Sequence, residues 1–222
     1  MSENTNSWIK EYLEPRYPEL VAPYRAAEHI HDAALKSGVL SEDGLAIILD
    51  SAKSSRTPLG ENVAAMLGEI ADRFDTVREA IRQLAKDPKV HVRVNALVAL
   101  ESLSVSQLQQ EILAAALRDR SARVRGLAAD KIMSFGLRPL LPALEDAIAS
   151  EAKPGLRCVL EWERDLLRDG FRTAAKEDGT VWVTCRRTAG TISRFFSAGG
   201  NGNCRPKMDS GYGCPRQRVT AD

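Results

Sequence analysis

The chain has 222 residues, and 44% of them are hydrophobic, so it can bury a core and is not disordered along its whole length. Its formal net charge of +1 excludes a global field that would attract nucleic acid or an anionic membrane. No apolar run reaches the ~18 residues of a membrane-spanning helix, and the first residues lack a secretion signal. We therefore expect a cytoplasmic protein.

The N-terminal third is acidic and is predicted to be helical. Residues 1–75 hold 7 Lys and Arg against 13 Asp and Glu. Within the N-terminal helices of residues 1–40, the stretch PELVAPYRAAEHIHDAALKSG predicts a helix that ends at Gly38. Its polar outer face suits the terminal cap of a stack of helices. A first helix pair follows, and Thr57 and Pro58 begin its second helix.

A pattern then recurs after 32 residues. DPKVHVRVNALVAL (87–100) and DRSARVRGLAADKI (119–132) share an acid, a Val-Arg pair, an Ala and a final aliphatic residue. The matched positions are Asp87 with Asp119, Val92 with Val124, Arg93 with Arg125, Ala96 with Ala128, and Leu100 with Ile132. One more step of the same length reaches Glu151 and Arg157. Self-similarity at a fixed period predicts stacked supersecondary units.

Each unit is predicted to contain two helices. In the unit of residues 76–103, Thr76 and Glu79 suggest a capping box, and Pro88 separates the two helices. The stretches RPLLPALEDAIASE and PGLRCVLEWERDLLRDG predict a last pair, which would bring the helical repeats to about residues 43–170. One pair cannot bury its apolar faces alone, so adjacent units must cover one another. Small alanines at the shared position would let neighbouring helices approach closely.

At these residues the chain resembles the short bacterial HEAT-like repeats. The family pattern is an Asp-Pro turn, then Val-Arg, then Ala three residues on, and here it reads Asp87-Pro88, Val92-Arg93 and Ala96. The clear match covers about residues 76–134. The resemblance implies a mainly α fold, an α-α superhelix (a HEAT-like solenoid) over residues 1–170. It does not imply one function, because such repeats occur in adaptors, in chromophore lyase subunits and in DNA repair glycosylases.

After Gly170 the pattern changes from helix to strand. Asp178 and Gly179 predict a hairpin turn between two strands, so we expect a small antiparallel β-meander over residues 171–198. Residues 199–222 are rich in Gly and poor in aliphatic residues, which predicts a flexible, disordered tail.

The repeated acid and arginine predict a structural ladder along the stack. The acid can accept hydrogen bonds from the second helix or its loop, and the arginine can reach an acid of its own unit or of the next. The predicted ladder residues are Asp87, Arg93, Asp119, Arg125 and Arg157.

Cations also gather in the loops between helices, and stacking would bring these loops to one edge. We call this predicted surface the basic ridge; its residues are Lys89, His91, Arg118, Arg120 and Arg123. At such a surface the cations can be solvated, bind an acidic protein, or hold phosphates. We expect His91 to be solvated.

No catalytic or metal-binding motif is present in the sequence. Its four cysteines match no zinc or redox spacing, and His29 and His31 would face different sides of a helix. We therefore expect no cofactor, no metal and no enzyme activity, but a scaffold or adaptor that binds a protein or peptide. The alternative is nucleic-acid binding, in its strongest form by a glycosylase-like enzyme. Residues 76–134 contain no aromatic residue that could stack on bases, which disfavours that enzyme.

Overall fold

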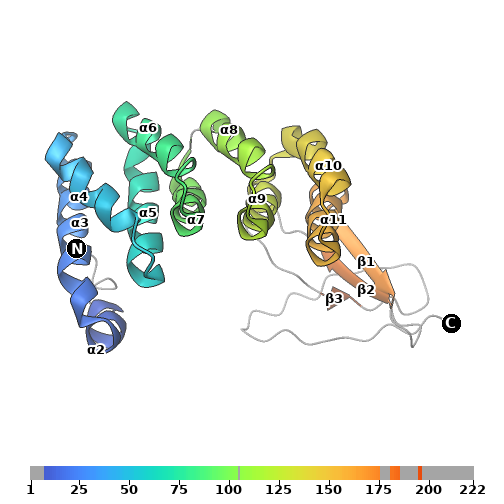
Figure 1. Cartoon of the computed structure of the whole chain (residues 1–222), viewed down its shortest axis with the longest axis horizontal. Helices are drawn as coiled ribbons and strands as arrows, with labels where there is room; N and C mark the ends of the chain where they lie inside the picture. The colour runs from blue at the N-terminus through green and yellow to red at the C-terminus, as the bar shows by residue number, and fades with distance from the viewer. Residues whose placement is uncertain (1–7, 105, 176–180, 186–194, 197–222) are drawn as a thin grey trace. The chain divides into compact units, whose positions relative to one another are not determined.

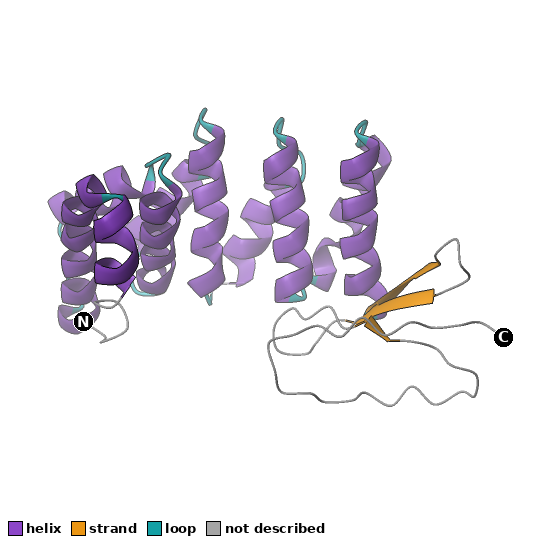
Figure 2. Cartoon of the chain, turned by 90° about the horizontal axis from the view of Figure 1, so that it is seen from below, coloured by secondary structure: helices purple, strands orange, loops and turns teal. Residues whose placement is uncertain are grey.

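The computed structural model describes residues 8–104, 106–175, 181–185 and 195–196, and the chain divides into two compact units, Met1–Ala128 and Ala129–Asp222. The described part is mainly helical (Figure 1). Its helices follow one another through short loops (Figure 2), an arrangement compatible with the predicted α-α superhelix. Within the described residues, no helix combines the length and apolar character needed to cross a bilayer.

The first unit consists of helices. In chain order they are the π-helical turn η1 (Ile9–Leu13), α2 (Glu14–Arg16), α3 (Pro18–Ser37), α4 (Glu42–Ala52), α5 (Thr57–Ala71), α6 (Asp75–Leu84), α7 (Val90–Ala99), the 3-10 turn η2 (Leu100–Ser102) and α8 (Ser106–Ala116). Helix α9 (Ala122–Phe135) contains the boundary between the units.

The ends of several helices follow from local sequence signals. Helix α3 ends at Gly38, which has the left-handed φ of 70° that glycine adopts without strain, as predicted. Helix α5 begins at Thr57 with Pro58 in its first turn, also as predicted. The hydroxyl of Ser41 accepts a hydrogen bond from the Gly44 amide (3.1 Å) and caps α4.

The capping box predicted at Thr76 and Glu79 is wrong. Helix α6 begins one residue earlier, at Asp75, and the residue before it, Phe74, makes no side-chain cap. The Asp75 carboxylate forms an ion pair with Arg78, and Glu79 accepts a hydrogen bond from Gln83 (2.6 Å). An ion pair and a hydrogen bond, each between residues about one turn apart, are thus formed in place of the reciprocal cap.

Helix α5 is the centre of the first unit. It packs against α3 and α4 on one side and against α6 and α7 on the other, and α3, α5 and α7 lie side by side in Figure 1. The approach to α7 is very close, because a Cβ atom at Gly68 would lie 2.0 Å from the carbonyl oxygen of Ala99. Ala64, Ala96 and Ala128 are completely buried, which confirms the role predicted for small residues.

The core of the first unit is apolar, and a buried amide within it, that of Asn95, connects two helix pairs. Its largest fully buried side chains are Ile9, Leu13, Ile48, Leu67, Ile70, Ile81, Leu97, Leu100, Leu108, Leu113 and Leu117. Asn95 on α7 is also buried, and its Nδ2 donates to the carbonyl of Ala52 at the end of α4 (2.8 Å). This bond joins the second helix pair to the end of α4 in the first pair and gives the buried Nδ2 a partner.

The second unit begins within α9 and contains η3 (Arg138–Leu140), α10 (Leu141–Ser150) and α11 (Pro154–Asp169). Helix α10 packs on α11, which ends at Gly170 with a φ of 79°. Strands β1 (Phe171–Ala175), β2 (Val181–Cys185) and β3 (Phe195–Phe196) follow in antiparallel order, with Phe171 opposite Cys185. The complete meander stays a prediction, because its turns lie outside the described residues, as does the tail of residues 199–222.

Candidate binding surface

Three loops lie side by side at one edge of the first unit. They connect α4 to α5, α6 to α7, and α8 to α9. The imidazole Nε2 of His91 lies 3.2 Å from the carbonyl oxygen of Lys53 in the first loop. The guanidinium of Arg120 donates to the carbonyl of Pro88 in the second loop (2.6 Å). Each loop is thus in contact with the one before it.

We call the surface of these three loops the basic edge; its cationic residues and histidine are Lys53, Arg56, Lys86, Lys89, His91, Arg118, Arg120 and Arg123. It contains the whole predicted basic ridge and adds Lys53, Arg56 and Lys86, which the repeat pattern did not identify. The cations are exposed, and the side chain of Arg123 is 64% exposed. His91 is only partly solvated, because its half-buried ring also contacts the first loop.

The loops share one hydrogen-bonding pattern. The Asp87 carboxylate accepts from the amide of Lys89 (2.8 Å), and Arg93 donates back to the carbonyl oxygen of Asp87 (2.7 Å). The same two bonds recur at Asp119, which accepts from Ser121 N (2.7 Å) and whose carbonyl accepts from Arg125 (2.7 Å). The acid therefore orders the loop amide, and the arginine satisfies the loop carbonyl.

The pattern occurs again in the second unit, with a longer acid. The carboxylate of Glu151 accepts from the amide of Lys153 (2.9 Å), and Nε of Arg157 donates to the carbonyl of Glu151 (3.0 Å). The 32-residue period of the sequence is therefore also a period of loop geometry.

Arg93 is a structural residue. Its guanidinium makes a bidentate ion pair with Asp119 of the next repeat, at 2.6 and 2.8 Å, and both side chains are largely buried (6% and 11% exposed). Burial raises the pKa of the Asp119 carboxyl, but the hydrogen bonds from Arg93 and the Ser121 amide outweigh burial and leave that pKa below its usual value. With the carbonyls of Asp87 and Pro88 also bound, four of the five N–H donors of Arg93 are used within the chain.

Arg123 is the opposite case. Its nearest carboxylate contact is long, 4.0 Å from Nη2 to Oε1 of Glu61 on α5. Both side chains are accessible to solvent, so this contact contributes little to stability. Glu61 instead acts as a weak internal competitor for any anion that approaches Arg123.

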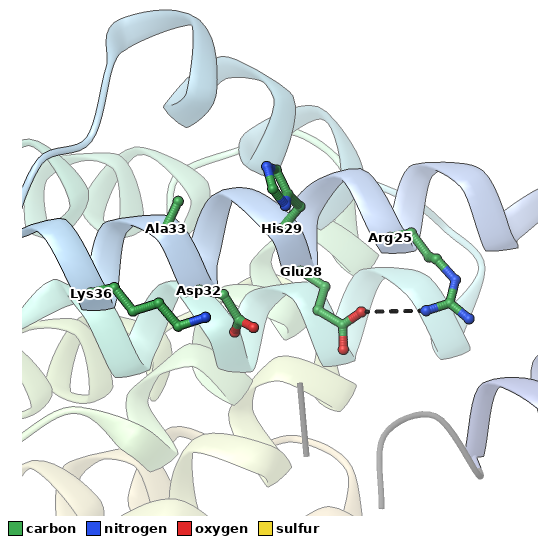
Figure 3. A pocket seen from close by; sticks show the side chains of 6 residues that line it. All are labelled: Arg25, Glu28, His29, Asp32, Ala33 and Lys36. Atoms are coloured by element: carbon green, nitrogen blue, oxygen red, sulfur yellow. Dashed lines mark ion pairs between the residues drawn. The ribbon is translucent and has the colours of Figure 1, made fainter. Parts of the chain in front are cut away.

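A hollow along α3 is the second feature of the first unit (Figure 3). Its lining comprises Arg25, Glu28, His29, Asp32, Ala33 and Lys36, and Arg25 lies 3.9 Å from Glu28. His31 faces the other way, as predicted, and is buried between Asp32 (3.3 Å) and Glu69 (3.1 Å). Burial and the nearby Glu28 raise the pKa of Tyr24 to about 12. Acids and bases alternate here, so the hollow has no dominant charge.

Glu163 on α11 is a further residue that the sequence patterns did not identify. Burial and the nearby Asp130 raise the pKa of Glu163 to about 7, and among the described residues its Oε2 has no hydrogen-bond partner. The carboxylate at Asp165, by contrast, pairs with Arg164 (2.7 Å) and Arg168 (3.5 Å). The described residues contain no group of three His, Cys, Asp or Glu side chains that could hold a metal ion.

Comparison with known protein families and with curated proteins finds no match for this chain. The resemblance to HEAT-like repeats therefore rests on the repeat residues themselves.

Proposed function

We propose that this chain is a non-enzymatic helical-repeat module of the HEAT-like type that binds a protein or peptide partner through the basic edge. One observation supports the proposal most strongly: three successive loops, each in contact with the next, hold exposed cations along one edge of the first unit. The ladder residues Arg93 and Asp119 hold the frame and are largely buried, whereas the cations of the basic edge are exposed to solvent. Exposed charges of this kind favour fast, salt-dependent association.

Affinity capture tests the proposal. The intact chain and the double variant Arg120→Glu with Arg123→Glu are each immobilised on a resin. Each resin is then incubated with a nuclease-treated lysate at low salt. The proposal expects specific partners on the unchanged chain and their loss from the variant, with an unchanged melting temperature. The matched control, Lys10→Glu with Lys36→Glu, makes the same change in net charge on exposed residues outside the basic edge and should retain the partners. Equal capture by all three proteins would refute the role of the basic edge.

Nucleic-acid binding is the second candidate, favoured by the exposed arginines Arg120 and Arg123. Phosphate contacts predict binding that weakens steeply as salt rises. Labelled duplex and single-stranded DNA, titrated at two salt concentrations, test this candidate. An absence of binding at low salt excludes it, because the electrostatic attraction is strongest there.

A further inference from the structure

Resting on the function proposed above, we infer that the basic edge binds an extended acidic peptide that carries a carboxylate at every third residue. Each of the three loops holds an exposed cation close to the start of the helix that follows it. Arg56 immediately precedes α5, Lys89 immediately precedes α7, and Arg120 lies two residues before α9.

The spacing of the loops sets the spacing of the ligand. Packed helices such as α5 and α7 lie about 8–10 Å apart, so the loops that precede them present their cations at about that interval, and the repeat extends this spacing to the loop before α9. An extended peptide in the polyproline II conformation has three residues per turn and rises about 3.1 Å per residue. Side chains three residues apart therefore point the same way, about 9 Å from one another. Seven residues then place one carboxylate at each loop.

The backbone at this edge adds to the attraction for anions. The residues that precede α5 and α7, Arg56 and Lys89, provide no side-chain cap for the first helical amides. The amino ends of these helices carry partial positive charge, which adds to the charge of the side chains. The cations remain the main determinant, because the helix effect is confined to the first turn.

The sparse cations fit a peptide better than a nucleic acid. Duplex DNA carries about one negative charge per 1.7 Å of its axis, which is denser than the two exposed cations that each loop provides over about 8–10 Å. The acids Glu61 and Asp87 lie among the cations and would repel a continuous row of phosphates. No aromatic residue occurs in residues 76–134 to stack on bases. Separated carboxylates avoid all three difficulties.

Two labelled peptides of identical composition test the register. One is Glu-Pro-Ala repeated three times, and the other has its three Glu residues in succession followed by the Pro and Ala residues. With the intact chain at low salt, we expect the spaced peptide to bind about 10-fold more tightly, since exposed ion pairs contribute about 1.5- to 5-fold each. Raising the salt concentration should remove most of this difference.

Charge exchange locates the contacts. Arg56→Glu, Lys89→Glu and Arg120→Glu should each weaken the spaced peptide several-fold. Replacing one terminal Glu of the peptide by Lys should restore binding to Arg120→Glu but not to Lys89→Glu, which pairs with the central Glu. Glu61→Gln should tighten binding, because it removes the internal competitor of Arg123.

The outcomes separate this inference from the proposed function. Equal binding of the two peptides, or binding of neither, overturns the inference, while capture that depends on Arg120 and Arg123 would still support the proposed function. Tighter, salt-sensitive binding of a 15-nucleotide single strand overturns the peptide assignment in favour of nucleic acid. Loss of edge-dependent capture overturns the proposed function itself.

Discussion

Two arginines of the first unit, only 30 positions apart, show how the same side chain can form the frame or the surface. Arg93 is 6% exposed and binds Asp119 and two carbonyls. Arg123 is 64% exposed, and Glu61 lies 4.0 Å away. Both belong to the first turn of a repeat helix. Only the difference in burial separates a residue that holds the repeats together from one that can receive a ligand.

This difference decides which cations belong to the candidate site. Counting basic residues would place Arg93 and Arg120 in one patch. Their contacts distinguish the two residues. The guanidinium of Arg93 is buried and bonds to the carbonyl of Asp87, whereas that of Arg120 is exposed and bonds to the carbonyl of Pro88 from the neighbouring loop. A desolvated charge that is fully paired is costly to disturb, whereas an exposed charge costs little to replace.

Removing the buried arginine should have the largest effect. Arg93→Ala leaves the Asp119 carboxylate partly buried without its partner and is expected to cost about 3–5 kcal/mol of unfolding free energy. Urea denaturation followed by circular dichroism measures this loss.

The matched control is the exposed pair between Arg82 on α6 and Glu111 on α8 (3.2 Å), which also connects two repeats. Arg82→Ala should cost less than about 1 kcal/mol. Similar losses in the two variants would mean that burial does not distinguish the frame from the surface.

The contact between α5 and α7 gives the next largest effect. In Gly68→Ala the new Cβ atom would meet the carbonyl oxygen of Ala99, so the helices must separate, and we expect a loss of about 1–3 kcal/mol. Gly155→Ala on α11 is the control, because a Cβ atom there meets nothing within 4 Å. It should stabilise the chain by up to about 1 kcal/mol, since alanine favours helix. Thermal denaturation distinguishes the two, and a stable Gly68→Ala variant would contradict the close packing.

The frame was more predictable from sequence than the site. The period of 32 residues identified Asp87, Asp119 and their arginines, because a contact that recurs must be encoded at each recurrence. The same rule overlooked Arg56, since the first loop carries Ser55 where later loops carry an acid, and Glu61 where they carry an arginine. The basic edge is formed by loops that are adjacent in space, so its residues need not recur at a fixed interval in the sequence.

Glu163 was missed for a related reason. It lies three residues from both Leu160 and Leu166 on α11, and this position on the apolar stripe is its sequence signal. Sequence periodicity places it near the apolar face, but only the packed structure shows that Oε2 has no hydrogen-bond partner among the described residues. Burial of a single carboxylate is a tertiary property, and so is its raised pKa.

The raised pKa of Glu163 predicts that the unfolding free energy depends on pH. The expected effect is smaller than that of Gly68→Ala and larger than that of the variants at the basic edge. Burial, with help from Asp130, raises the pKa of Glu163 from 4.5 in the unfolded chain to about 7. Between these values the folded state binds more protons, so this residue lowers stability as pH rises through about 4.5–7. Glu163→Gln should remove that decline and stabilise the chain at pH 8 by on the order of 1 kcal/mol. Glu161→Gln is the control, and equal pH profiles for the unchanged chain and Glu163→Gln would refute the assignment.

The smallest effect is expected at the basic edge, where the double variant Arg120→Ala with Arg123→Ala should change the unfolding free energy by no more than about 0.5 kcal/mol. Arg120 loses its bond to the Pro88 carbonyl, but that carbonyl keeps the hydrogen bond from Arg93 (3.0 Å). Arg123 loses only the long contact with Glu61. Urea denaturation at low and high salt gives the measurement, and the variant should match the unchanged chain at both. A loss near that of Arg93→Ala would make these arginines part of the frame and remove the argument that they are kept for a partner.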